Sequence, residues 1–525
     1  MHEMTLDMQP VKSWPLTWAT AVDRNSMKFL LHAQVDQDTI DRQLGTADYS
    51  YFFLLRAFAG VLAELGEVVQ LRDVLEADVI HAQCVARNES CVLLSFAPPH
   101  KTPLGLACPT VPLFAWEYPD IPERIEETCW MDDPRHDWRR VFAFTGHAIT
   151  LSSHTVDAVK RSMGANFPIV AIPSPIGSIA GKVEMSKSPI PAQGVLLRVN
   201  ASVADSLRMG LDAAGLLSLE EEDGTGFDPV DAEILSKHPG IAHEAGEFAP
   251  APSVPVIDPT DLEADSNESA PLDCGWDLPV AMPIRTRLHG LVYTAVLTPT
   301  AGRKNWEDLI TAFCWTFRDT EDATLILKLA GTDLQRHHHQ LLMLLTKLSP
   351  LKCRVIAING YLSDEDYAAL VAATTYYVNT SLCEGLCLPL VEFLSKGVPA
   401  IAPDNTAMAD YIRDDLAFVV ASYPGIPTVW PHGDNEVNRT SYHQLDWESL
   451  TEAFRRSHDV ARHDPARYRQ MSLRACQAMQ AYCGPDVVKS LLQAFLCPAL
   501  SIPDERGELP AGDAVSLGRT ASATP

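Results

Sequence analysis

The 525-residue sequence lacks the features that mark a membrane-spanning or disulfide-bonded protein. No apolar run approaches the roughly 18 residues that a membrane-spanning helix needs. The first residues, MHEMTLDMQPVKSW, show no basic region followed by an apolar segment, so no signal peptide is expected. The twelve cysteines include no pair at the CxxC spacing. Because scattered cysteines of this kind behave as small apolar side chains in a reducing compartment, we expect a cytoplasmic protein without a transmembrane segment.

Basic residues are also scarce. The chain has 41 Lys and Arg against 68 Asp and Glu, for a formal net charge of −27. More than half of this excess of negative charge lies between Glu220 and Asp277, a segment that contains 16 Asp and Glu residues but a single basic residue, Lys237. The acidity is therefore concentrated in one segment. A strongly acidic chain is a poor candidate for nucleic-acid binding, so we expect no nucleic-acid partner.

That acidic stretch belongs to a longer region, residues 178–284, which is rich in Pro, Ala, Ser and acid and poor in aromatics. Such a composition cannot bury enough apolar surface to offset the entropy lost on ordering. It predicts a largely disordered insertion, with a short helix near residues 203–217. A solvated spacer is the simplest role, and a regulatory or partner-docking arm is the alternative. Residues 1–26 and 499–525 are expected to be a loose lead-in and a disordered tail.

The rest of the chain alternates short apolar runs with amphipathic stretches, which is typical of parallel α/β domains. In residues 27–177 we expect a Rossmann-like domain with helices after Asp48 and Ser153. Its strands are expected at 27–35, 68–71, 79–82, 91–96, 113–116, 148–151 and 169–172. A second such domain is expected in residues 285–465, with strands at 292–297, 323–329, 354–358, 376–379 and 398–402. Helices in residues 466–498 close the fold.

One stretch of the second domain carries two carboxylates. Residues 376–403, YYVNTSLCEGLCLPLVEFLSKGVPAIAP, read as a strand, a loop with Glu384, a helix with Glu392 and another strand. Loops beyond the carboxyl ends of parallel strands are where α/β sheets bind ligands. The N–H groups of residues 385–387 would lie at the helix N-terminus, a favourable seat for a diphosphate. Because two glutamates eight residues apart also occur by chance, an ordinary helix is the alternative.

In its full context, this stretch resembles the Glu-x7-Glu signature of the family-4 retaining glycosyltransferases. The match comprises residues 384–386, 389–392 and 397–399, and the wider resemblance runs from about residue 293 to residue 418. The segment ITLSSHTVDAVKRSMG is similar to a strand–Ser–helix unit in the N-terminal half of these enzymes. The resemblance implies the GT-B fold, in which two Rossmann-like domains face each other across a cleft and C-terminal helices cross back. It implies transfer of a sugar, with retention, from a nucleotide-diphosphate sugar to a glycan, lipid-linked or small-molecule acceptor.

The resemblance also implies roles for residues of the donor site. Glu384 would contact the donor sugar, and Gly385 and Leu386 would offer backbone N–H groups to the sugar and phosphate. Glu392 would hold the ribose hydroxyls. The nucleotide pocket would be closed by Thr406 and Met408.

Two cations precede the first helix of the second domain. Lys304 stands at the position of the family's lysine, whereas the position of the family's arginine falls near Pro299. Arg303 is the candidate replacement. Because cations at a helix start oppose the helix dipole, a phosphate-binding role is favoured over a solvated Arg-Lys pair.

The first domain offers two candidates that follow predicted strands. His100, in FAPPHKTP, is a candidate for a position near the reacting carbon, because imidazole can bond to a sugar hydroxyl or a developing charge. Glu117, in FAWEYPDIP, is a candidate acceptor contact. A surface histidine and a structural tie are the respective alternatives. No clear glycine-rich loop follows the first strand, where Gly45 is the only nearby glycine.

Neither a metal nor a cofactor is expected beyond the nucleotide sugar, because the resembling family is generally metal-independent. The consecutive histidines 337–339 do not change this, since neighbouring helical residues point about 100° apart and cannot chelate together. Peripheral contact with a membrane is left open, although no basic amphipathic helix indicates it. Two other functions also stay open. One is another GT-B class, such as a phosphorylase or a sugar-nucleotide epimerase, and the other is a degenerate GT-B protein acting as a non-catalytic glycan-binding or scaffold subunit.

Overall fold

A computed structural model of the chain describes residues 27–36, 40, 48–123, 133–176, 195–199, 201–208, 284–331, 334–425, 428–429 and 439–497. These residues belong to one compact unit, residues 1–211 and 283–525, whereas the unit formed by residues 212–282 lies outside them. The expected lead-in, most of the acidic insertion and the expected tail also lie outside the described residues. Their disorder stays a prediction, as do the domain boundaries.

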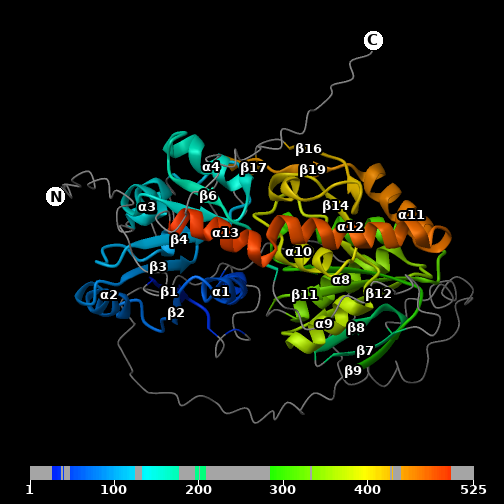
Figure 1. Cartoon of the computed structure of the whole chain (residues 1–525). Coiled ribbons are helices and arrows are strands. Elements are labelled where there is room, and N and C mark those ends of the chain that lie inside the picture. The colour runs from blue at the N-terminus through cyan, green and yellow to red at the C-terminus, as the bar shows by residue number, and fades with distance from the viewer. Residues whose placement is uncertain are drawn as a thin grey trace, which may run out of the picture. The chain divides into compact units, whose positions relative to one another are not determined.

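The first sheet has six parallel strands in the order β2-β1-β3-β4-β5-β6 (Figure 1). The strands are β1 (Met27–Ala33), β2 (Glu67–Gln70), β3 (Ser90–Phe96), β4 (Thr110–Phe114), β5 (Ala148–Thr150) and β6 (Ile169–Ala171). The helices are α1 (Tyr49–Leu62), α2 (Glu76–Ala86), α3 (Trp138–Thr145) and α4 (Ser153–Met163), with 3-10 turns η2 (Pro99–Lys101) and η3 (Pro134–His136). The strand order reverses between β1 and β3, which makes their carboxyl ends the topological switch point of this sheet.

The second sheet runs in the order β15-β14-β13-β10-β11-β12-β8. Its strands are β8 (Ser202–Asp205), β10 (Leu291–Leu297), β11 (Ala323–Leu329), β12 (Arg354–Asn359), β13 (Tyr376–Val378), β14 (Ala400–Pro403) and β15 (Ala417–Val420). Its helical elements are η4 (Ser206–Arg208), η5 (Gly302–Lys304), α7 (Trp306–Thr316), α8 (Leu334–Leu348), α9 (Asp364–Ala373), α10 (Leu388–Ser395) and η6 (Thr406–Asp410). The switch point here lies between β10 and β13. All seven residues of the interior strand β11 are buried, as expected for a parallel strand covered on both faces.

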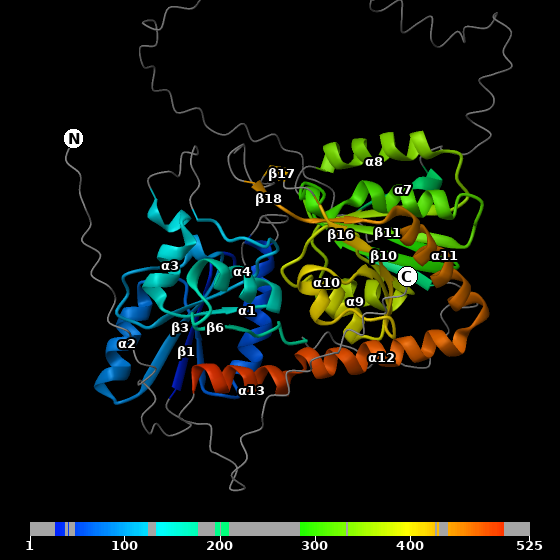
Figure 2. The same ribbon diagram turned by 90° about the horizontal axis from the view of Figure 1, so that it is seen from above.

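Three long helices end the described chain: α11 (Trp447–His463), α12 (Pro465–Cys483) and α13 (Pro485–Leu496). Asp446 and Asp464 cap the first two, since their carboxylates accept bonds from the N–H groups of Ser449 and Arg467. Helix α12 packs against α10 of the second sheet, and α13 packs against α1 of the first (Figures 1 and 2). The predicted architecture, two Rossmann-like domains with helices that return to the first, is thereby confirmed.

Small two-stranded pairings complete the described elements. They are β7 (Val195–Val199) with β9 (Ile284–Leu288), β16 (Ser422–Pro424) with β19 (His443–Leu445), and β17 (Thr428–Val429) with β18 (Arg439–Thr440). None of the helices in the described part of the chain has both the length and the apolar character needed to span a bilayer.

Two local predictions were wrong. Residues 79–82, predicted as a strand, lie inside helix α2. A short apolar run cannot by itself distinguish a strand from a helix, and here Glu76 and Asp78 in the first turn favour a helix start. Within the region predicted as a largely disordered insertion, residues 195–199 and 202–205 form strands β7 and β8. Strand β8 overlaps the start of the short helix expected near residues 203–217, of which residues 209–217 lie outside the described residues. Strand β8 pairs antiparallel with β12, and its Asp205 accepts two bonds from Arg354, at 2.6 and 3.0 Å.

Candidate functional site

Four charged side chains from both domains meet at the ends of strands. Glu117 follows β4, Arg303 and Lys304 lie in η5 after β10, and Glu384 follows β13. We call these four residues the charged cluster. Since β10 and β13 flank the switch point of the second sheet, the cluster occupies the position where open α/β sheets bind ligands.

The carboxylate of Glu384 lies between the two cations. Its Oε1 is 2.5 Å from Nζ of Lys304, and its Oε2 is 3.0 Å from Nη1 of Arg303. The Nε of Arg303 is 2.8 Å from Oε1 of Glu117, so Arg303 joins a carboxylate from each domain. The side chain of Glu384 is only 4% exposed. Two cations and two carboxylates leave the cluster formally neutral, which is what allows it to be buried.

Electrostatics keep the Glu384 carboxylate ionised. Burial alone would raise its pKa, but the charges of Lys304 and Arg303 outweigh burial and hold the pKa below its ordinary value of 4.5. A hydrogen bond from the Ser381 side chain acts in the same direction. At neutral pH the cluster therefore holds a carboxylate that accepts hydrogen bonds beside two cations that can bind an anion.

The loops that carry the cluster are fixed through backbone groups. The N–H of Glu384 donates to Oγ1 of Thr406 at 2.9 Å, and the N–H of Leu382 donates to the carbonyl of Arg303 at 2.8 Å. The hydroxyl of Thr380 donates to the carbonyls of Lys304 and Asn305. These bonds join the loops after β10, β13 and β14 into one platform. The predicted donor-site residue Thr406 thus lies directly against Glu384.

Helix α10 begins just after the charged loop. Gly385 packs so closely on the first domain that a Cβ added there would lie 2.8 Å from the amide nitrogen of Trp116 and 3.1 Å from Cβ of Ala115. Leu386 and Cys387 are buried, and Cys387 adopts a left-handed φ of 65° at the N-cap position. Among the described residues, no side-chain hydrogen bond caps this helix. The first N–H groups of a helix have no intrahelical partner, so those of this turn can donate to a ligand, except at Pro389, which has no N–H.

Glu392 and Met408, two further predicted donor-site residues, contact different side chains. Tyr367 of α9 donates a hydrogen bond of 2.8 Å to Oε2 of Glu392, and burial raises the pKa of this carboxyl to about 7. Part of the Glu392 population is therefore protonated at neutral pH. The sulfur of Met408 lies 3.5 Å from Nδ2 of Asn379, which also bonds Sγ of Cys387 at 2.9 Å.

His100 lies in η2, at the switch point of the first sheet. Its ring stacks on His136 with centroids 5.1 Å apart and on Trp138 at 6.1 Å. Trp138 in turn packs edge-on against Trp116, the neighbour of Glu117. Burial, together with the charges of His136 and Lys101, lowers the pKa of His100 to about 4, so the ring is neutral at pH 7. These described ring contacts tie His100 to its own domain and do not join it to the charged cluster.

Several residues that the sequence analysis did not single out support the site. The backbone of Trp116 packs against Gly385, and Asn379 bonds Sγ of Cys387. The hydroxyl of Thr380 bonds the carbonyl of Lys304, and the side chain of Ser381 bonds Glu384. Asn379, Thr380 and Ser381 are consecutive polar residues directly after the buried strand β13. A polar run at the carboxyl end of a parallel strand is a signal that could have identified them.

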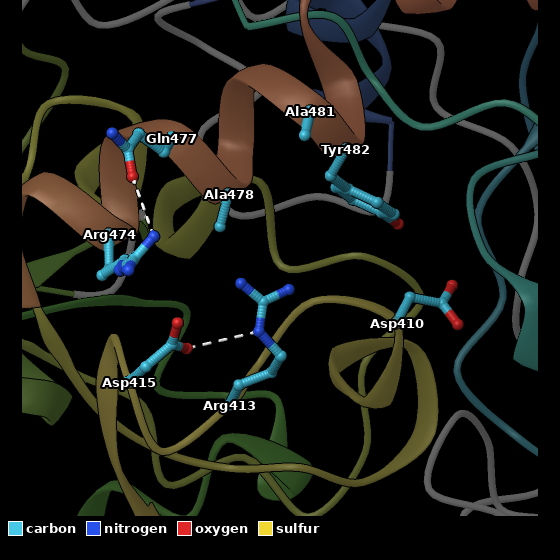
Figure 3. Close-up of a pocket in the computed structure, with 8 residues that line it drawn as sticks. All are labelled: Asp410, Arg413, Asp415, Arg474, Gln477, Ala478, Ala481 and Tyr482. Atoms are coloured by element: carbon cyan, nitrogen blue, oxygen red, sulfur yellow. Dashed lines mark hydrogen bonds and ion pairs between the residues drawn. The ribbon is translucent and has the colours of Figure 1, made fainter. Parts of the chain in front are cut away.

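A pocket of about 360 Å³ lies elsewhere, between helix α12 and residues 410–415 (Figure 3). Its lining includes two hydrogen-bonded pairs of side chains, Arg413 with Asp415 and Arg474 with Gln477. None of the predicted site residues lines it. Because Asp410 at its rim bonds the N–H and hydroxyl of Ser153 at the start of α4, this pocket borders a structural tie between the two domains.

Comparisons with known proteins give only remote similarities. No family model matches the chain, and no curated protein matches it significantly. Among solved structures, it is similar to HepE of Anabaena in complex with UDP and glucose, with 12% identity over 90% of this chain and 100% of that one and a TM-score of 0.45. It is similar to sucrose-phosphate synthase from Thermosynechococcus elongatus, with 12% identity, coverage of 90% and 98% and a TM-score of 0.44. For the pneumococcal O-GlcNAc transferase GtfA in complex with UDP and GlcNAc, identity is 9%, coverage is 81% of this chain and 61% of that one, and the TM-score is 0.40. A functional assignment must therefore rest on the residues of the chain itself.

Proposed function

We propose that this chain is a retaining glycosyltransferase that uses a nucleotide-diphosphate sugar as donor. The observation that carries the proposal is the charged cluster, in which Lys304 and Arg303 lie on either side of the Glu384 carboxylate at the switch point of the second sheet. Transfer from such a donor needs cations for the departing diphosphate and hydrogen-bond acceptors for the sugar hydroxyls. The cluster offers both within one group of contacting side chains.

Donor binding would exchange partners within the cluster. The diphosphate takes over Arg303 and Lys304, whose charges are neutralised in the structure by Glu384 and Glu117. The Glu384 carboxylate, once released, accepts hydrogen bonds from hydroxyls of the donor sugar. The N–H groups at the start of α10 add a second, uncharged seat for phosphate oxygens. The cations thereby stabilise the charge that develops on the diphosphate as it leaves.

The remaining predicted residues complete this proposal. Glu392 holds the ribose hydroxyls, Gly385 and Leu386 give N–H groups to the sugar and phosphate, and Thr406 and Met408 border the nucleotide. His100, a neutral imidazole, and Glu117 serve the acceptor side. The acceptor is a glycan, a lipid-linked glycan or a small molecule, and the reaction takes place in the cytoplasm without a metal or a further cofactor.

The proposed reaction proceeds on one face of the sugar. The bond between the anomeric carbon and the β-phosphate oxygen breaks, and the acceptor oxygen bonds to the same face of that carbon. The acceptor proton passes to the leaving phosphate, so no protein nucleophile is required. Lys304 and Arg303 lower the barrier by holding the phosphate oxygens that receive negative charge.

Two observations favour a second candidate, a degenerate GT-B protein that binds glycans without catalysis. Arg303 and Lys304 are already neutralised by carboxylates, and Pro299 stands where the resembling family has an arginine. In such a protein the charged cluster would only join the two domains. The two candidates differ in whether the cluster binds a nucleotide sugar.

A calorimetric binding screen tests the proposal. The full chain is titrated with UDP-, GDP- and ADP-sugars, alongside Lys304→Ala, Glu392→Ala and the matched control Lys347→Ala, which removes an exposed lysine of α8. We expect one nucleotide class to bind. Loss of a charge-assisted hydrogen bond, about 1.5–3 kcal/mol, should weaken binding to Lys304→Ala by about 10- to 100-fold, with no change in the control. If the folded wild-type chain binds none of these donors, the scaffold function is favoured instead.

A further inference from the structure

A second group of reactive side chains lies on the first sheet, and neither the proposed function nor the sequence analysis uses it. His81 and Cys84 belong to α2, Cys91 to β3, and Cys108 to the segment before β4. We call these four residues the thiol cluster. Nδ1 of His81 is 3.3 Å from Sγ of Cys91, and Sγ of Cys91 is 3.9 Å from Sγ of Cys108. The ligand atoms of these three residues all lie within 4.8 Å of one another.

The spacing of these atoms fits a tetrahedral zinc ion. With Zn–S bonds of about 2.3 Å and Zn–N bonds of about 2.0–2.1 Å, tetrahedral geometry places two sulfurs about 3.8 Å apart and a sulfur and a nitrogen about 3.5 Å apart. The distances in the thiol cluster are 3.9 and 3.3 Å. A disulfide would instead require the two sulfurs at about 2.05 Å. Two of the three distances among His81, Cys91 and Cys108 thus match a tetrahedral zinc site, and the third is at most 4.8 Å.

Cys84 offers a fourth ligand from the same helix as His81, although its sulfur is outside the group whose ligand atoms all lie within 4.8 Å of one another. It follows His81 by three residues on α2, so both side chains leave the same face of the helix. Its thiol lies beside that of Cys91. The full set reads His-x2-Cys-x6-Cys-x16-Cys in the sequence. Three cysteines and one histidine form one of the usual ligand sets of structural zinc sites.

The packing of α2 supplies an independent reason for a metal. An amphipathic helix normally turns its large apolar side chains toward the core. Helix α2 follows this pattern poorly, since Val79 and Val85 are 60% and 63% exposed and only Ala77 and Cys84 of its eleven residues are buried, with Ile80 packed half-buried against the core beneath. On the inner side, Asp78 accepts a hydrogen bond of 3.0 Å from the N–H of Cys108. Because so little apolar surface is buried, helix α2 is held weakly on the first sheet, and a bound ion would stabilise its attachment.

We propose that His81, Cys84, Cys91 and Cys108 bind one Zn²⁺ ion that fastens α2 and the segment before β4 to the first sheet. On binding, the three thiols release their protons to solvent and coordinate as thiolates. The site then carries one negative charge, spread over three thiolates, and Lys28, whose charge acts on the thiols of Cys84 and Cys91, is itself paired with Glu67 and Glu89. His81 is half-buried and gives the ion a route from solvent. The proposal does not depend on the proposed transferase activity.

Metal analysis of the full chain tests this proposal. The protein is purified under reducing conditions, stripped with a chelator, reloaded with Zn²⁺ and desalted, and its metal content is measured by mass spectrometry. We expect one zinc per chain, and replacement by Co²⁺ should give thiolate-to-cobalt charge-transfer bands together with the intense visible bands of a tetrahedral site. The chelator should also lower the melting temperature, because zinc binds the folded chain more tightly than the unfolded one.

Three variants make the result specific. Cys108→Ala and His81→Ala should both lose the retained zinc, and the half-buried position of His81 makes its variant the safer one to fold. Cys353→Ala is the matched control, because Cys353 forms a buried thiol pair with Cys314 that has no place in the proposed site. The control should keep one zinc per chain. Equal zinc content in wild type and folded His81→Ala would overturn the proposal. A wild-type chain that retains no zinc after reduction and reloading would also overturn it, whether or not Cys91 and Cys108 form a disulfide.

Discussion

Replacing Glu384 with alanine is expected to destabilise the folded chain by about 3–5 kcal/mol, the usual cost of removing one partner from a buried ion pair. The reason is that Lys304 and Arg303, at 15% and 17% side-chain exposure, would lose the carboxylate between them. The midpoint of urea denaturation, followed by circular dichroism at pH 7, measures the effect. In a double-mutant cycle, adding Lys304→Met should cost less in Glu384→Ala than in wild type, with a coupling energy of about 0.5–3 kcal/mol.

The same prediction has a pH dependence. Because the folded pKa of Glu384 is held below its ordinary value of 4.5, its stabilising contribution is complete above that value and is lost as the pH falls through the folded pKa. The difference between wild type and Glu384→Gln should therefore shrink in acid. Glu321→Gln, at an exposed position, is the control and should change stability by no more than about 0.5 kcal/mol. A Glu384→Ala variant as stable as this control would show that the ion pairs contribute nothing.

Gly385→Ala is expected to disturb both stability and ligand binding, although it adds a single methyl group. The new Cβ would lie 2.8 Å from the backbone nitrogen of Trp116 and 3.1 Å from Cβ of Ala115. Because backbone atoms cannot move aside as a flexible side chain can, we expect a loss of about 1–3 kcal/mol from overpacking. The displaced segment leads directly to Glu117, so binding of the donor should weaken as well. Thermal denaturation and calorimetric titration measure the two effects.

Gly302→Ala is the matched control for this substitution. Gly302 lies in the same site, next to Arg303, but a Cβ there would meet nothing within 4 Å. We expect its stability to stay within about 0.5 kcal/mol of wild type. If Gly385→Ala has the same stability and donor affinity as Gly302→Ala, the close contact between the start of α10 and the first domain contributes to neither folding nor ligand binding.

Local patterns were sufficient to predict the second domain and much of the first. The runs at 292–297, 323–329 and 354–358 are apolar and bounded by helix caps, and they form β10, β11 and β12 close to the expected residues. The approximate positions of Glu384, Lys304 and Glu117 after strands followed from the same pattern. These features depend on short-range periodicity, which a single sequence displays directly.

Contacts between distant segments could not be predicted. The ion pair of Arg303 with Glu117 joins the two domains, and the sequence around neither residue predicts it. The misassigned strand at 79–82 had a further consequence, because residues three apart point to opposite faces of a strand but share one face of a helix. His81, inside the predicted strand, and Cys84, two residues beyond it, were therefore not placed on one helix face. Strand β8 escaped prediction because it is short and stabilised by pairing with β12.

The most direct test of the central claim compares a nucleoside diphosphate with the corresponding monophosphate by calorimetric titration. The base is the one identified with the sugar donors, and the proteins are wild type, Lys304→Ala and Lys347→Ala. If Lys304 and Arg303 bind the second phosphate, the diphosphate should bind wild type at least about 10-fold more tightly than the monophosphate. That advantage should persist in Lys347→Ala and largely disappear in Lys304→Ala. Equal affinity of wild type for the two nucleotides would contradict the assignment of the charged cluster as a diphosphate site.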